Sequence, residues 1–424
     1  VLCRSSLSAG AVPGYNIVRI NGDNISFSER RIYGDTAVEF APWYRYHFSG
    51  NAPQDSVKYD NDGLPEDYPW MRYDVNVRYP QVKENWKRSF EANIVAGFAV
   101  RGGRAYFPLA CGVVKCISLK DGSEIWSRQF DGKIYSTPAI SGKTLVFGCT
   151  DGNVYALKAS DGSVKWKYHT EKSVLASPVI MDGLVYIGGS DHKFRALSLK
   201  DGSAVWTYSP VEGHAISTPY CDGERVVFGT WGRTLYSLEP RTGREQWRWT
   251  VKKPSRMYSP AHCVPVYGSG RIFVAVPDRK IYAIDAATGK CLFNVDGGRD
   301  ALCGSEDGKT VFSKVMFGKA YAFRSDVPAP AGGEISSGNK LWEVADSLGY
   351  DIGTSALTEK DGVLLIPSDK GNIVALDAAT GEFLWAHKVS VALVNPLKVS
   401  SDKKRMTVLA STMDGTVTLL TIEK

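Results

Sequence analysis

The sequence lacks the features that would place it in a membrane or on nucleic acid. No apolar run approaches the roughly 18 residues that a transmembrane helix requires, so we expect no membrane-spanning segment. The 51 basic and 45 acidic residues are spread along the chain without a Lys/Arg-rich block, which argues against a nucleic-acid partner. No secretory signal is visible at Val1, where a charged and then apolar stretch would be needed.

Residues that build redox and metal centres are few and poorly spaced. The eight cysteines include no neighbouring pair and no Cys-x-x-Cys-His haem pattern. Most of them lie in strand-like stretches, where a buried free thiol behaves as a small apolar residue, so they do not decide the redox compartment. The six histidines form no His-x-His or Asp-x-His pair, so we expect ordinary strand and turn residues rather than a metal site.

Tryptophan, in contrast, recurs along the chain at a nearly constant spacing. The gaps between successive positions are 40, 40, 40, 41, 46, 49 and 43 residues, with one phenylalanine in the series. A repeat of this length built from short strands is typical of a β-propeller. The positions are Trp86, Trp126, Trp166, Trp206, Trp247, Phe293, Trp342 and Trp385.

One repeat reads as four short strands. Residues 135–140, 145–147, 154–157 and 164–168 are rich in β-branched and aromatic residues, and polar turns containing glycine separate them. Four antiparallel strands with such turns make one blade of a propeller.

Two further positions repeat with each aromatic residue and indicate how blades pack. A small residue precedes the aromatic by ten positions and a glycine precedes it by four. We interpret the small residue as leaving a hole, the glycine as supplying a positive φ in the turn, and the indole as filling a gap between blades. The eight aromatic residues are therefore predicted to dock the blades. The small residues are Cys116, Ala156, Ala196, Ser237, Ala283 and Ala375, and the glycines are Gly122, Gly162, Gly202, Gly243, Gly289, Gly338 and Gly381.

The ends of the chain indicate how the ring closes. Residues 82–88 read as a lone tryptophan strand, and after Trp385 the chain offers three strands without a fourth. One blade assembled from both ends would leave no open sheet edge at the junction. We therefore predict an all-β fold: a monomeric eight-bladed β-propeller of four-stranded antiparallel blades over residues 81–424. Extra residues at 326–333 are expected to form a loop in the blade between Phe293 and Trp342.

The runs Val154-Tyr155-Ala156-Leu157, Asp161-Gly162 and Trp166 resemble the pyrroloquinoline quinone (PQQ)-like repeat. Quinoprotein dehydrogenases and the lipoprotein of the outer-membrane Bam assembly machinery share this repeat. The resemblance covers about residues 82–424 and implies the propeller fold and a periplasmic or cell-envelope location. It implies little about activity, because one fold hosts many functions.

Two functions follow from this resemblance. The dehydrogenases resemble one another in an adjacent cysteine pair over the quinone, which the spacing of Cys111 and Cys116 does not reproduce, and no calcium-ligand set can be located by a motif. We therefore disfavour a quinone-dependent dehydrogenase and expect neither PQQ nor calcium as a cofactor. A Bam-type scaffold remains an alternative, although the residues before Cys3 lack the small side chains of a lipobox.

The first eighty residues do not follow the blade pattern. Residues 1–40 contain a predicted hairpin around an Asn-Gly turn, which is similar to the last hairpin of calcineurin-like metallophosphoesterases. The chain would then be the C-terminal module of a larger enzyme; the alternative is a local hairpin packed on the propeller. Residues 41–80 read as an aromatic-rich connector, and the Asp60-Asn61-Asp62-Gly63 run lacks the downstream Glu of a calcium loop.

A ligand site is expected where the innermost strands begin, at the mouth of the central channel. A ring with Lys, His and Arg would favour an anionic small ligand or an acidic segment of a protein partner; a solvated rim of mixed polar residues is the alternative. We predict a non-catalytic binding or scaffolding propeller without catalytic residues. The candidate residues are Asn93, Lys133, Ser173, His214, Arg256 and Tyr350.

Overall fold

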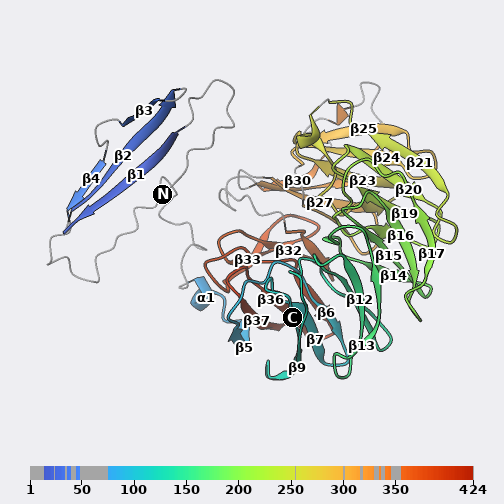
Figure 1. Ribbon diagram of the computed structural model, residues 1–424, viewed down its shortest axis with the longest axis horizontal. Helices are drawn as coiled ribbons and strands as arrows, with labels where there is room; N and C mark the ends of the chain where they lie inside the picture. Colours follow the sequence, from blue (N-terminus) through green and yellow to red (C-terminus); the bar gives the residue numbers. More distant parts are fainter. Residues whose placement is uncertain are drawn as a thin grey trace. The chain divides into compact units, whose positions relative to one another are not determined.

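The computed structural model divides the chain into two compact units, Val1–Glu66 and Asp67–Lys424, which are described separately (Figure 1). The residues that the structure describes are 14–22, 24–33, 36–39, 44–47, 75–253, 255–298, 301–315, 319–328, 334–335, 340–344 and 355–423. Among them, no helix is long and apolar enough to cross a membrane.

The first unit contains the predicted hairpin, which is confirmed. Strands β1 and β2 pair antiparallel from Gly14↔Arg31 to Asn21↔Asn24, and Gly22 takes a φ of +55° in the turn between them. The two other strands of this sheet both pair with β2. The Asp60–Gly63 run and most of the expected connector at 41–80 lie outside the described residues. The strands are β1 (Gly14–Asn21), β2 (Asn24–Tyr33), β3 (Thr36–Glu39) and β4 (Tyr44–His47).

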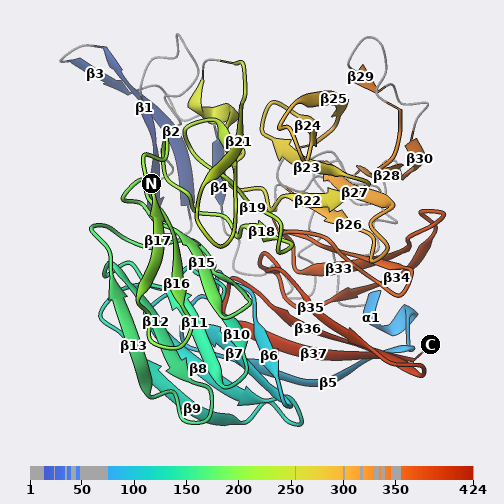
Figure 2. The ribbon, with the colours of Figure 1, turned by 90° about the vertical axis from the view of Figure 1, so that its right-hand side faces the viewer.

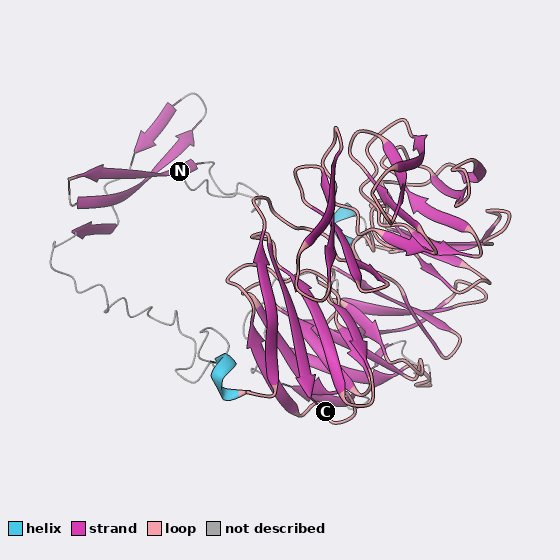
Figure 3. Cartoon of the chain, turned by 90° about the horizontal axis from the view of Figure 1, so that it is seen from below, coloured by secondary structure: helices cyan, strands magenta, loops and turns pink. Residues whose placement is uncertain are grey.

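The second unit is the predicted eight-bladed propeller, and its blades are almost entirely strand and turn (Figure 3). Blades 1 to 4 follow the chain without interruption, with each strand paired to the next. Blade 1 is β6 (Ala99–Arg101), β7 (Arg104–Pro108), β8 (Val113–Ser118) and β9 (Glu124–Gln129); blade 2 is β10 (Ala139–Ser141), β11 (Thr144–Gly148), β12 (Asn153–Lys158) and β13 (Val164–His169); blade 3 is β14 (Val179–Met181), β15 (Leu184–Gly188), β16 (Phe194–Ser198) and β17 (Ala204–Tyr208); blade 4 is β18 (Tyr220–Cys221), β19 (Val226–Gly229), β20 (Thr234–Leu238) and β21 (Glu245–Thr250).

Blades 5 to 8 are less regular. Blade 5 carries a fifth strand, and blade 8 takes its outer strand from the start of the propeller. Blade 5 is β22 (Val266–Gly268), β23 (Arg271–Val276), β24 (Lys280–Asp285), β25 (Cys291–Asp296) and β29 (Glu334–Ile335); blade 6 is β26 (Leu302–Gly304), β27 (Thr310–Val315), β28 (Lys319–Arg324) and β30 (Lys340–Val344); blade 7 is β31 (Thr358–Lys360), β32 (Val363–Pro367), β33 (Asn372–Asp377) and β34 (Phe383–Lys388); blade 8 is β35 (Lys398–Ser401), β36 (Arg405–Ser411), β37 (Thr416–Glu423) and β5 (Val82–Ser89).

The repeated small residue lies directly opposite the aromatic residue of its own blade. Ala156 pairs with Trp166 and Ala283 with Phe293 in the register of the third and fourth strands, and a bulge follows each pair. Ala156 and Trp166 belong to the same buried cluster, and Trp166 is only 8% exposed. The small residue is therefore a partner of the aromatic residue within its own blade, and its role in leaving a hole stays a prediction.

The repeated glycine belongs to the next blade and receives the indole. The Trp126 ring lies on Gly162, where an added Cβ would meet Cε3 at 2.7 Å, and the Trp126 Nε1–H donates to the Ala159 carbonyl at 3.1 Å. A single turn of the neighbouring blade thus packs against the indole ring and also accepts a hydrogen bond from its one polar atom. The same indole-to-carbonyl bond joins Trp86 to Leu119, Trp166 to Leu199, Trp206 to Pro240, Trp247 to Ala286 and Trp342 to Ala378.

The ring closes as predicted, with β5 as the outer strand of blade 8. Strand β37 pairs antiparallel with β5 from Thr416↔Ser89 to Ile422↔Val82, and the two lie side by side in Figure 2. The Lys83 Nζ lies 2.6 Å from a Glu423 carboxylate oxygen at the outer end. Just before β5, the short helix α1 (Val75–Arg78) holds the ring from outside, since the Asn76 amide bonds both the N–H and the carbonyl of Lys388.

One feature of blades 5 and 6 was not predicted from the sequence. The insertion before β30 returns to blade 5 and adds β29 to its outer edge, in parallel register with Asn294 and Val295. The outer strand β25 still offered unpaired N–H and C=O groups, which an added strand can satisfy. Much of the loop expected at 326–333 lies outside the described residues.

The two faces of the propeller are defined by their turns. The upper face carries the turn between the second and third strands of each blade and the connector to the next blade, as at 149–153 and 170–178. The lower face carries the other two turns, as at 142–143 and 159–163. Because the indole contacts use the lower-face turns, the upper face is less constrained by blade docking.

We predict that a side chain at Gly162 destabilises the propeller for two separate reasons: the positive φ of the backbone and the collision with the Trp126 ring. Gly162→Ala should cost about 1–2 kcal/mol for the left-handed conformation at φ +71° and roughly 1–3 kcal/mol more for the collision with Trp126. Gly142→Ala is the matched control, because φ is +57° there and nothing lies within 4 Å of an added Cβ. Equal losses of thermal stability in both variants would contradict the packing argument.

A second prediction concerns His387, which is 3% exposed on β34 and whose two ring nitrogens have no hydrogen-bond partner. Burial, aided by the charge of Lys87, lowers its pKa to about 4. The unfolded chain takes up this proton near pH 6.5, so stability should fall by about 2–3 kcal/mol as the pH drops from 6.5 to 4.

His387→Leu should remove this pH dependence, and the measurement is the difference in unfolding free energy between variant and wild type at several pH values. His169→Gln, at an exposed histidine of β13, is measured in parallel as the surface comparison. A difference that stays constant between pH 6.5 and 4 would show that His387 does not titrate as described.

Candidate functional site

Four of the six predicted channel-mouth residues occupy one equivalent place on the upper face. The carbonyl of each accepts a hydrogen bond from the backbone N–H seventeen positions later, in the upper turn of the same blade. The structure thus places them in one series around the upper face. The pairs are Asn93 with Ala110, Lys133 with Thr150, Ser173 with Ser190 and His214 with Trp231.

The structure places Arg256 differently from the expected alignment. Arg256 starts the short helix η1 (Arg256–Tyr258), and Ser259 is the residue whose side chain contacts the upper turn: its Oγ donates to the Trp231 carbonyl at 3.1 Å. The Ser173 Oγ donates to the Thr150 carbonyl in the same way. The connector before blade 5 is longer and contains η1, which spacing alone could not locate. Tyr350 lies outside the described residues.

Three upper turns carry a charged or imidazole side chain where other blades carry glycine. Gly152 has a φ of +85°, whereas His192, Arg233 and Arg279 have φ values of +61°, +67° and +68° at the same place. The turn itself is unchanged, since the carbonyl at this position still accepts the N–H of the following connector. A left-handed conformation costs about 1–2 kcal/mol for a residue with a Cβ. These substitutions were missed from the sequence, although an Asp-Gly turn that changes to Asp-His or Asp-Arg was visible.

Basic residues gather around two of these turns, on blades 4 and 5. We call Arg233, Lys252, Lys253, Arg256 and Arg279 the basic rim. The Arg233 guanidinium donates to the Lys253 carbonyl at 2.7 Å and fixes the connector. The Lys253 Nζ lies 3.3 Å from the buried Asp278 carboxylate and 5.0 Å from the centre of the Tyr258 ring.

Apolar and aromatic side chains accompany the basic rim. Met257 is 74% exposed in η1, and Lys252 and Arg256, which precede it in the connector, are exposed as well. The Trp231 ring meets the exposed His262 edge to face at 5.1 Å. Cations beside aromatic and thioether groups are characteristic of protein-binding surfaces.

A buried ion pair under the upper face is structural. Asp191 and Arg195 are 6% and 3% exposed, and their side chains bond to each other in the turn of blade 3. Burial raises the pKa of Asp191, but the hydrogen bond and charge of Arg195 outweigh it and hold the pKa below its ordinary value. The same turn position holds Asp151 with the Tyr155 hydroxyl at 2.6 Å in blade 2, so the pair shapes the turn rather than binding a ligand.

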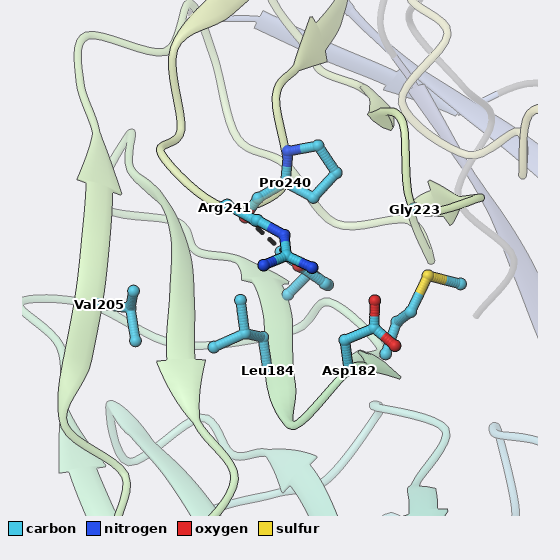
Figure 4. Close-up of a pocket in the computed structure, with 8 residues that line it drawn as sticks. Asp182, Leu184, Val205, Gly223, Pro240 and Arg241 are labelled. Atoms are coloured by element: carbon cyan, nitrogen blue, oxygen red, sulfur yellow. Dashed lines mark hydrogen bonds between the residues drawn. The ribbon is translucent and has the colours of Figure 1, made fainter.

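A small cavity opens on the lower face between blades 3 and 4 (Figure 4). It measures about 280 Å³, and its lining includes the apolar Leu184 and Val205 together with the charged Asp182 and Arg241. A second, wider cavity of about 510 Å³ lies on the upper face where blade 8 meets blade 1, beside Phe90.

Several cysteine thiols among the described residues are shielded from solvent. The seven described cysteines are free thiols. Burial raises the pKa of Cys116 and of Cys149 to about 11, which keeps both protonated at neutral pH. Within the same residues, no group of three or more His, Cys, Asp or Glu side chains is arranged to hold a metal ion.

Solved structures confirm the fold. The chain is similar to BamB from Moraxella catarrhalis, at 20% identity and a TM-score of 0.65 over 80% of this chain and 97% of that one. It is also similar to the computationally designed Ika8 protein, at 17% identity and a TM-score of 0.65 over 78% of this chain and 97% of that one. Quinohemoprotein alcohol dehydrogenase from Comamonas testosteroni matches at 14% identity and a TM-score of 0.64 over 84% of this chain and 80% of that one. A comparison with curated proteins finds no match.

A family model described as outer membrane protein assembly factor BamB matches residues 80–210, 110–257, 209–343 and 329–424. The matches overlap and together span the whole propeller, from just before β5 to the end of the chain. The N-terminal hairpin lies outside them, so its likeness to metallophosphoesterases stays a prediction. On this match the chain belongs to the BamB family of PQQ-like propellers.

Proposed function

We propose that this propeller is a non-catalytic scaffold that binds an acidic segment of a protein partner on its upper face, in the cell envelope. The observation that carries the proposal is the basic rim, where the exposed Lys252, Lys253 and Arg256 share one connector with the 74% exposed Met257. The family description as an assembly factor favours a protein partner over a small ligand.

The rim is suited to recognition because it is held rigid before any partner arrives. The Arg233 and Lys253 contacts fix the connector, and the ring of docked blades fixes the turns beneath it. A preorganised surface loses little conformational entropy on binding. Clustered positive charge also accelerates encounter with an acidic segment and disfavours basic partners.

A role in outer-membrane assembly is the more specific form of this proposal. It is favoured by the family description and by the similarity to a BamB structure. A quinone-dependent dehydrogenase remains the less favoured function, because the chain lacks an adjacent cysteine pair. A third hypothesis is that this chain is the C-terminal module of a phosphoesterase. The N-terminal hairpin is the feature that suggests it, and the sequence upstream of Val1 would test it.

We predict that a fluorescein-labelled peptide of ten Asp and Glu residues binds the full chain and that a Lys peptide of equal length does not. Lys252→Glu combined with Arg256→Glu should weaken this binding about tenfold or more at 0.1 M salt, because two attractions become repulsions. Fluorescence anisotropy measures both affinities, and higher salt should weaken the wild-type complex.

The matched control is Lys120→Glu combined with Lys200→Glu. Both lysines are exposed on lower-face turns, so the control changes the net charge equally without touching the basic rim. If both double variants bind the peptide equally weakly, the loss of affinity is an effect of net charge and not of the basic rim. Unchanged binding in the rim variant would refute the proposed surface.

A further inference from the structure

His192 and His214 come together on the upper face of blade 3, although 22 positions separate them in the chain. His192 is in the upper turn of the blade, and His214 is in the connector that leaves it for blade 4. Their ring centroids are 4.9 Å apart, with an angle of 47° between the planes.

The hydrogen bonds of the two rings fix which nitrogen carries the proton when each is neutral. The His192 Nδ1 lies 3.2 Å from the Val211 carbonyl, and the His214 Nδ1 lies 2.8 Å from the Ser190 carbonyl. A carbonyl oxygen can only accept, so both Nδ1 atoms must be the donors. Each neutral ring therefore keeps a lone pair on Nε2, the nitrogen that can bind a metal ion.

This arrangement is the one that protein metal sites impose on their histidine ligands. A metal-bound histidine commonly donates its other ring N–H to a backbone carbonyl, which sets the tautomer and the ring orientation. With metal–nitrogen bonds of about 2.0–2.1 Å, two imidazoles on one tetrahedral ion have centroids about 5 Å apart. The observed 4.9 Å matches that requirement.

We propose that His192 and His214 form a surface site for a late divalent transition-metal ion, Zn²⁺ or Cu²⁺. Imidazole nitrogen is a preferred ligand of both ions. With two protein ligands, water completes the coordination, so the ion exchanges readily and plays no part in folding. The site is independent of the basic rim, and either proposal can fail without the other.

Local backbone geometry adds a second reason to single out this pair. His192 holds a φ of +61° at a position where Gly112, Gly152, Gly371 and Gly415 serve four other blades. His214 makes through its ring the same bond that Ser173 makes through its hydroxyl. Glycine at position 192 would fit the backbone with less strain, and serine at position 214 could make the same hydrogen bond with a smaller side chain.

The test titrates ZnCl₂ and CuCl₂ separately into the full chain by calorimetry. We expect one bound ion per chain and a loss of affinity of about tenfold or more in His192→Gly and in His214→Ser. Both variants install the residue that other blades use at that place, so thermal stability should be retained or raised in His192→Gly. For Cu²⁺, electron paramagnetic resonance should show nitrogen hyperfine splitting that each variant diminishes.

His262→Ala is the control, because His262 is exposed on the same face but contacts Trp231 instead of another histidine. It should bind either ion as the wild type does. Binding that is absent below millimolar metal, or that both His192→Gly and His214→Ser leave unchanged, would overturn the proposal and leave two rings that merely pack against each other.

Discussion

The contact on which this structure depends is that of an indole with the turn glycine of the next blade. The Trp206 ring presses on Gly243, where an added Cβ would come within 2.5 Å, and its Nε1–H reaches the Pro240 carbonyl at 2.8 Å. A sheet of four strands buries one face only with a neighbour, so blades are stable together rather than singly. The indole contact sets the angle and distance of that neighbour, and it recurs at six blade junctions among the described residues.

Much of the fold was predictable because this contact leaves a trace in the sequence. A bulky aromatic residue, a small residue ten positions earlier and a glycine four positions earlier are three independent marks of one packing arrangement. Strand β29 left no such trace, since its pairing depends on backbone groups of β25 that any sequence provides. The position of Arg256 was missed for a related reason: the repeat fixes strands but not the length of the connector that contains η1.

The candidate site was less predictable because it depends on contacts between turns and connectors. The likeness of Lys133, Ser173 and His214 followed from the repeat, and the structure places them in one series. The pairing of His192 with His214 did not, since His-x-His spacing describes ligands on one strand, whereas this pair joins a turn to a connector. The cationic turns were visible as lost glycines, but only the positive φ of Arg233 and Arg279 shows that the backbone stayed the same.

The division between the two faces follows from how the blades are joined. Lower-face turns receive the indoles, so Gly162 and its equivalents can take no side chain without disturbing a blade junction. Upper-face turns also need a left-handed residue, and most of them are crowded by the connector: an added Cβ at Gly112, Gly371 or Gly415 would lie within 2.6 Å of a backbone carbonyl oxygen. The turns of blades 3, 4 and 5 nevertheless hold His192, Arg233 and Arg279, at a conformational cost of about 1–2 kcal/mol each. The lower face is therefore fixed by blade docking, whereas three upper turns keep the same backbone conformation with a side chain in place of glycine.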